Sequence, residues 1–177
     1  MTELLRVARV DKTFVAPRRF DDGLLRLIGR APRRAVLRAV RDVSLDMTRG
    51  EALGLVGESG CGKSTLGRVI AGVHPQSAGQ VLLSGAPVTN AAGAKTTTRV
   101  QMVFQDPFAS LDPRMRVGDS LAEGPLAHGL TTRAGVRDYV GGWLDAVNLP
   151  REAAGRYPHQ FSGGQRQRIA IARALAM

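Results

Sequence analysis

Apolar and polar side chains alternate along the first part of the chain. The alternation covers Leu4–Val10, ends at Asp11–Phe14 and resumes over Val36–Met47, which predicts two half-buried strands. Thr48-Arg49-Gly50 is expected to turn the chain after the second strand. Short apolar runs predict three more strands, at Glu51–Val56, Gln80–Ser84 and Val100–Phe104.

The rest of the chain has the apolar spacing of amphipathic helices. This spacing predicts four helices, over Leu66–Val73, Val117–His128, Thr132–Val147 and Arg166–Met177. Trp143 lies on the apolar face of the third, which favours a core position over a ligand contact. Residues 85–98 are small and polar and are expected to form a loop.

Composition narrows the class of protein. With 177 residues, 44% hydrophobic and 23% charged, the chain resembles one ordinary soluble domain. No apolar run approaches the ~20 residues of a membrane span, and residues 1–10 lack the apolar core of a signal peptide. We therefore expect a cytoplasmic location. The single cysteine excludes an intramolecular disulfide and a cysteine metal cluster.

The charge balance is strongly basic. The net charge is +10, and every basic residue is arginine except Lys12, Lys63 and Lys95. Such a charge suits a nucleic acid, an anionic membrane or an arginine-rich solvated surface. No basic run is interleaved with aromatics, so no specific nucleic acid is expected. Residues 15–35 hold two Pro/Arg clusters, which predict an inserted basic loop that touches lipid or a partner, or a plain surface excursion.

The stretch Glu51–Gly72 contains the phosphate-loop pattern between a predicted strand and a predicted helix. Its loop residues are Gly57, Glu58, Ser59, Gly60, Cys61, Gly62, Lys63, Ser64 and Thr65. Glycines let backbone N–H groups curl around a phosphate, and the helix dipole points at the same anion. We expect Lys63 to reach the β- and γ-phosphates and Ser64 to ligate Mg²⁺. Cys61 is either a reactive thiol in an electropositive loop or a small side chain in a tight turn.

Three other places are candidate site residues. Phe14 either stacks on a base or belongs to the core. Gln105 follows a predicted strand, where it contacts the metal and attacking water or merely caps the strand. Ser162-Gly163-Gly164-Gln165 opens a predicted helix with a capping serine and two glycines, which makes a second anion site or a plain helix start.

Two anion-binding patterns separated by a Gln and a helical segment resemble the nucleotide-binding subunit of ABC transporters. Gly57–Thr65 is similar to the Walker A loop, Gln105 to the Q-loop, and Phe161–Gln165 to the family signature, with Phe where Leu is commoner. Phe14 sits where the adenine-stacking aromatic usually lies. Three stretches resemble the oligopeptide/dipeptide (and nickel) importer branch: Gly57–Thr65, Val103–Met115 and Tyr157–Arg168.

The resemblance implies a fold and a mechanism. The fold is α/β: a P-loop NTPase core with an antiparallel β subdomain and a helical insertion. Two such subunits would dimerise head to tail, with each ATP between one Walker A loop and the partner's Ser162, Gly163 and Gly164. Gln105 would report nucleotide state to membrane permease subunits that receive solute from a binding protein. The subunit would lie peripherally on the inner face of the plasma membrane.

The resemblance also implies domain boundaries. Residues 1–50 and 80–98 would form the β subdomain, 51–79 the Walker A strand, loop and helix, and 100–115 the Q-loop region. Residues 116–160 would form the helical subdomain and 161–177 the signature and its helix.

In the family, the Walker B strand with its Asp and Glu, the D-loop and the switch His come later, and none is present here. We therefore expect an amino-terminal fragment, truncated before the Walker B strand, that binds nucleotide weakly without turnover. Its apolar strands would be left exposed where their neighbours belong. The alternatives are a nucleic-acid-associated ABC-type ATPase and a non-catalytic nucleotide-binding fragment. An unrelated P-loop kinase would not explain Ser162–Gln165.

Overall fold

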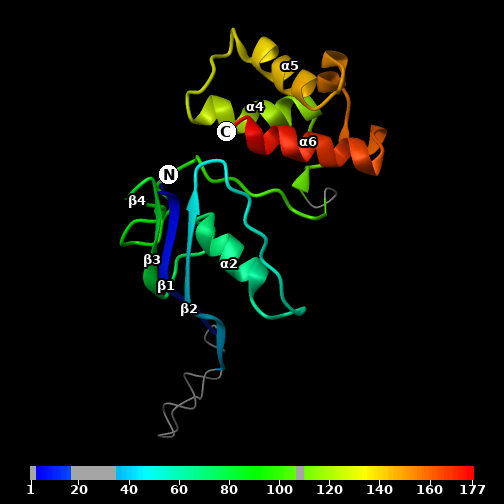
Figure 1. The fold of residues 1–177 in the computed structure, drawn as a ribbon. Helices are drawn as coiled ribbons and strands as arrows, with labels where there is room; N and C mark the ends of the chain where they lie inside the picture. Colours follow the sequence, from blue (N-terminus) through cyan, green and yellow to red (C-terminus); the bar gives the residue numbers. More distant parts are fainter. Residues whose placement is uncertain (1–2, 17–34, 107–109) are drawn as a thin grey trace, which may run out of the picture. The chain divides into compact units, whose positions relative to one another are not determined.

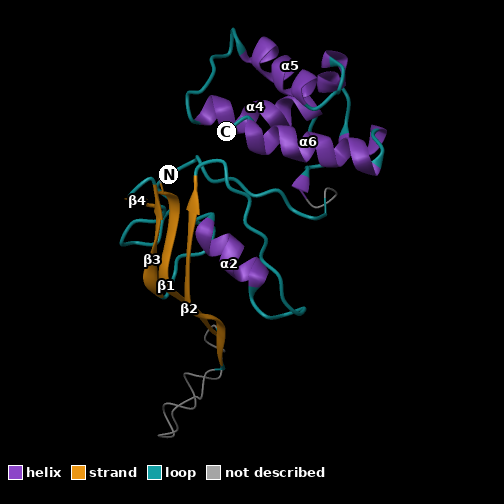
Figure 2. Cartoon of the chain, viewed as in Figure 1, coloured by secondary structure: helices purple, strands orange, loops and turns teal. Residues whose placement is uncertain are grey.

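The computed structural model describes residues 3–16, 35–106 and 110–177, in two compact units. The first unit is Met1–Val100 and the second is Gln101–Met177. All the strands fall in the first unit, while the second contains helices (Figures 1 and 2). The predicted insertion 15–35 lies mostly outside the described residues.

The first unit is built on an antiparallel sheet with the order β2-β1-β3-β4. The strands are β1 (Glu3–Val15), β2 (Val36–Thr48), β3 (Ala78–Leu83) and β4 (Ala86–Pro87). The prediction that the first strand ends at Asp11–Phe14 is wrong. Pairing of β1 with β2 continues to Val15, because Thr13, Phe14 and Val15 face Arg38, Leu37 and Val36 across the ladder.

One short helix, α2 (Lys63–Ile70), covers a face of this sheet (Figure 1). Its Leu66 and Val69 are buried in one apolar cluster with side chains from the sheet. The cluster partners are Leu5, Val7, Val10, Val40, Val81 and Val88. This packing holds the amino end of α2 against β1 and β2, which positions the loop before it.

Two predicted strands do not form. Residues 51–56 and 100–104 have no regular secondary structure, and no strand in the described part of the chain pairs with them. A strand is stable only when its N–H and C=O groups find a neighbouring strand. The expected exposure of their apolar side chains is confirmed, since these side chains are open to water: Leu53, Leu55, Val56, Val103 and Phe104.

The second unit is a helical cluster with its own core. Its helices are α4 (Val117–Ala127), α5 (Val136–Ala146) and α6 (Gly163–Leu175), with short 3-10 turns η1 (Arg151–Gly155) and η2 (Pro158–Gln160). Leu121, Leu144 and Ile169 are fully buried between them, and Trp143 packs at the edge of this core, as predicted. None of the helices among the described residues is long and apolar enough to cross a membrane.

Candidate functional site

The loop before α2 is curved and exposed. Gly60 has φ of 82° and Gly62 has φ of 102°, left-handed values that favour glycine. The backbone N–H of Cys61 donates to the carbonyl of Glu58 at 3.3 Å, which closes a turn. A Cβ on Gly57 would lie 2.9 Å from the Cys61 Sγ, so the two ends of the loop approach each other. The loop is thus a ring-like turn rather than an extended segment.

The ammonium group of Lys63 lies inside this ring. Its Nζ donates to the carbonyls of Gly57 and Glu58, both at 2.6 Å, and lies 3.5 Å from the Cys61 Sγ. The side chain therefore curls back over the loop instead of extending into water. An anion entering the turn would meet a positive charge that the loop itself holds in place.

Side chains do not close the amino end of α2. Its N-cap residue is Gly62, which offers no side-chain oxygen, and its first turn has no acidic residue. The backbone N–H groups of a first helical turn have no partner within the helix. Here they carry the positive end of the helix dipole without a competing carboxylate, which is the arrangement that a phosphate requires.

Gly62 fixes the loop against the sheet. A Cβ built on it would overlap the carbonyl oxygen of Ala39 and lie 3.7 Å from the Cγ2 of Val40. Only a glycine permits this contact at a left-handed φ. The junction between loop and helix is therefore tied to one place on β2.

A hydrogen-bonded turn anchors the chain that enters the loop. The Glu51 carboxylate accepts from the backbone N–H of Thr48 at 2.7 Å and from its hydroxyl at 3.0 Å. These two bonds, the backbone bond first, lower the pKa of Glu51 below its ordinary value. The predicted turn at residues 48–50 is confirmed, with Gly50 at φ of 83°.

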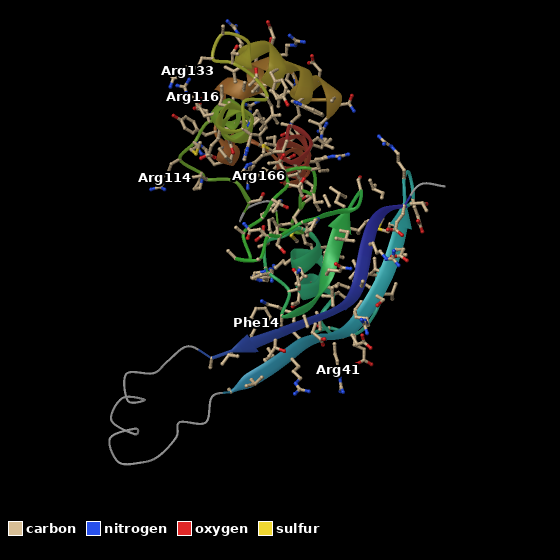
Figure 3. The ribbon with its side chains drawn as sticks, turned by 90° about the vertical axis from the view of Figure 1, so that its left-hand side faces the viewer. Phe14, Arg41, Arg114, Arg116, Arg133 and Arg166 are labelled. Carbon is tan, nitrogen blue, oxygen red and sulfur yellow. The ribbon has the colours of Figure 1, made fainter. Side chains whose placement is uncertain are left out.

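Phe14 lies at the far end of β1 and belongs to neither buried apolar cluster (Figure 3). The Nζ of Lys12 lies 4.9 Å from its ring centroid, and His74 meets the ring edge-on at 5.5 Å. Sequence reasoning singled out neither neighbour. Residues two apart on a strand lie on the same face of the sheet, so the sequence could have placed Lys12 beside Phe14. No sequence pattern near His74 indicates its contact with Phe14.

The second candidate anion site is the amino end of α6. Ser162 is the N-cap: its Oγ accepts from the Gln165 N–H at 3.3 Å, while the Gln165 Oε1 accepts from the Ser162 N–H at 2.9 Å. This is a complete capping box. Neither Gly163 nor Gly164 takes part in it, and a Cβ on either would meet open space.

Gln105 is exposed and lies outside regular structure, so the prediction that it ends a strand is wrong. It belongs to the second unit, whereas Ser64 belongs to the first. Within the described ranges no cluster of three His, Cys, Asp or Glu side chains is placed to hold a metal ion.

Comparison with known proteins identifies the family. Residues 40–177 match the sequence profile described as ABC transporter, and this match includes both helix amino ends. The chain belongs to the ABC transporter family. Solved ABC cassettes share its fold: the dimeric ATP-binding cassette MJ0796 bound to ADP and Pi has a TM-score of 0.70 at 26% identity, over 98% of this chain and 69% of that one.

Curated relatives of this ABC transporter chain are named for peptide import. The oligopeptide transport ATP-binding protein OppF of Bacillus subtilis is 45% identical over 100% of this chain and 55% of its own length. A putative peptide import ATP-binding protein of Brucella abortus is 52% identical over 81% of this chain and 44% of its own length. The chain spans about half the length of these relatives.

Proposed function

We propose that this chain supplies the ATP-binding part of an energy-coupling subunit in an ABC importer for peptides or related solutes. The observation that carries the proposal is the Lys63 ammonium held inside a curved glycine loop at an uncapped helix start. The names of the two relatives support the importer class and the solute class.

The triphosphate would bind in the loop Gly57–Thr65. Backbone N–H groups of the turn and of the first turn of α2 would donate to its oxygens, and Lys63 would move from the loop carbonyls to the β- and γ-phosphates. The exposed Ser64 hydroxyl can join the Mg²⁺ that accompanies the phosphates, together with Gln105. Bound there, the ion would neutralise charge that develops on the γ-phosphate during hydrolysis.

The adenine would stack on Phe14. Gly62 ties the loop to Ala39, and Leu37, the register partner of Phe14, lies two residues away along β2. Two residues along a strand span about 7 Å. The loop and Phe14 therefore lie close enough along the sheet for one nucleotide to reach both.

Full activity would require a second ATPase subunit. The free glycine amides at the start of α6 would contact the γ-phosphate of an ATP held by the partner, and Gln105 would position the attacking water. The MJ0796 cassette, which shares this fold, has been solved as a dimer, and this supports pairing. The energy of this cycle would be passed to membrane permease subunits.

Titration of the intact protein with MgATP tests the proposal. Lys63→Met should weaken binding roughly tenfold to a hundredfold, because charge-assisted hydrogen bonds are lost. Arg68→Gln, which removes one charge from the same helix outside the loop, should bind as the unchanged protein does. ATP-dependent peptide uptake by the assembled transporter should follow the same order. Equal affinity of the Lys63→Met protein would reject the site.

A further inference from the structure

The side chain of Lys12 is buried although it carries a charge. It is only 9% exposed, and its Nζ donates to the Pro75 carbonyl at 2.7 Å. Burying an ammonium group costs free energy that an apolar side chain of the same length would not incur. The position of its charge, over the Phe14 ring, therefore calls for a role beyond packing.

The segment that carries His74 is fastened to the same end of β1. The Ser77 N–H donates to the Asp11 carbonyl at 2.8 Å, and the Thr13 N–H donates to the Ser77 Oγ at 3.0 Å. His74 meets the Phe14 ring at an interplanar angle of 83°. These two bonds fasten Ser77 to the β1 residues on either side of Lys12, so the segment with His74 is held beside the Phe14 ring.

We propose that Lys12 and His74 are positioning residues that fix Phe14 as a platform for the purine base of the bound nucleotide. This inference rests on the proposed function. Lys12 covers one face of the ring and His74 an edge, which leaves the opposite face of the half-exposed ring for the base. The cation draws the ring's electrons toward its own side, which makes the opposite face a better partner for an electron-rich purine.

The hydrogen bond of Lys12 and its place on β1 indicate how its charge would act on a bound nucleotide. Lys12 pairs with Val40 and Phe14 with Leu37, so both residues lie beside the place where Gly62 meets β2. Lys12 donates to Pro75 rather than to a loop carbonyl, so its effect should reach the nucleotide through the ring and leave the triphosphate contacts unchanged.

Binding of two probes by the intact protein separates these contributions: MgATP, and magnesium tripolyphosphate, which has no base. Phe14→Ala and Lys12→Met should each weaken MgATP binding, by roughly five- to thirtyfold and three- to tenfold, with tripolyphosphate binding unchanged. Lys12→Arg should restore the affinity. In a Phe14→Ala background, Lys12→Met should have little further effect on MgATP, because the ring through which it acts is gone.

A second pair of variants keeps the test open if Lys12→Met fails to fold. His74→Ala should weaken MgATP binding about threefold, whereas His74→Phe, which keeps an aromatic edge, should bind normally. Equal losses for both probes, or effects of Lys12→Met and Phe14→Ala that multiply, would overturn the inference. If the unchanged protein does not bind MgATP, the proposed function itself fails. If Phe14→Ala weakens binding while Lys12→Met does not, only this inference fails.

Discussion

The amino ends of α2 and α6 are both rich in glycine, yet only α6 is capped by side chains. At α2 the cap is a left-handed glycine without a side-chain bond, and the cation beside it bonds to loop carbonyls. At α6 a serine and a glutamine satisfy each other's backbone N–H groups. The first end leaves its donors for a ligand, while the second is already closed except at Gly163 and Gly164.

The glycines at the two helix ends also differ in whether the backbone requires them. Gly62 is required by the backbone, because its φ is left-handed and a side chain would overlap Ala39. Gly163 and Gly164 lie in a helix with open space around them, so the fold would accept a side chain. At Gly163 and Gly164 the fold gives no reason for glycine, so close approach of a ligand is the explanation that the variants below test.

The largest expected effect is on the free energy of unfolding when Gly62, at the amino end of α2, is replaced. Gly62→Ala should lower the free energy of unfolding by about 3 kcal/mol or more, since the left-handed penalty adds to the overlap with the Ala39 carbonyl. Gly60→Ala is the matched control: it has a similar φ but open space, and should cost only about 1–2 kcal/mol. Urea unfolding measures both, and equal losses would show that the contact with β2 contributes nothing.

The stability of the amino end of α6 should depend on its N-cap residue, Ser162. Ser162→Ala removes the oxygen that accepts from Gln165 and should cost about 1 kcal/mol in urea unfolding. Ser162→Asp, which can cap in the same way, should retain stability while placing a negative charge where the partner's γ-phosphate is proposed to bind. ATP-dependent dimerisation would then be lost in a stable protein. Normal dimerisation of this variant would contradict the proposed contact.

A smaller effect is expected at Gly164, where one substitution should separate the stability of α6 from its proposed contact with the nucleotide. Gly164→Ala should stabilise α6 by up to about 0.5 kcal/mol, because alanine favours a helix but the gain is smaller in the first turn than in the interior. The added methyl group should nevertheless weaken ATP-dependent dimerisation, because it faces the space proposed for the phosphate. Gly142→Ala, in α5 and also in open space, serves as the control: it should stabilise the protein and dimerise normally.

The smallest expected effect is on the alkylation rate of Cys61, in the loop before α2. Cys61 is exposed and lies within 3.5 Å of the Lys63 Nζ, so an alkylating reagent can reach it. MgATP at saturating concentration should slow its alkylation severalfold, as followed by mass spectrometry, whereas adenosine should not. An equal rate with and without MgATP would place the triphosphate elsewhere.

Local rules predicted what local interactions decide. Alternation predicted the strands that became β1 and β2, and the serine before two glycines predicted the N-cap of α6. Pairing between distant segments was beyond such rules. Apolar content alone predicted strands over residues 51–56 and 100–104, although whether a strand forms depends on a neighbour that these segments lack within the described chain.

The contacts of the candidate site divide in the same way. The loop of glycines, Lys63 and Ser64 could be identified from the spacing of a few adjacent residues. The bonds of Lys63 to the loop carbonyls and the edge contact of His74 with Phe14 could not, because they depend on how side chains settle once α2 has packed on the sheet.

The exposed segment before the glycine loop has a consequence for handling this polypeptide. Leu53, Leu55 and Val56 present apolar side chains to water, with Val56 93% exposed, on backbone that pairs with no strand in the described part of the chain. Such a segment promotes association between copies, which the net charge of +10 opposes by repulsion. Added salt screens that repulsion over roughly 10 Å at 0.1 M. Light scattering should therefore rise with sodium chloride concentration, and colloidal stability should be best in dilute buffer.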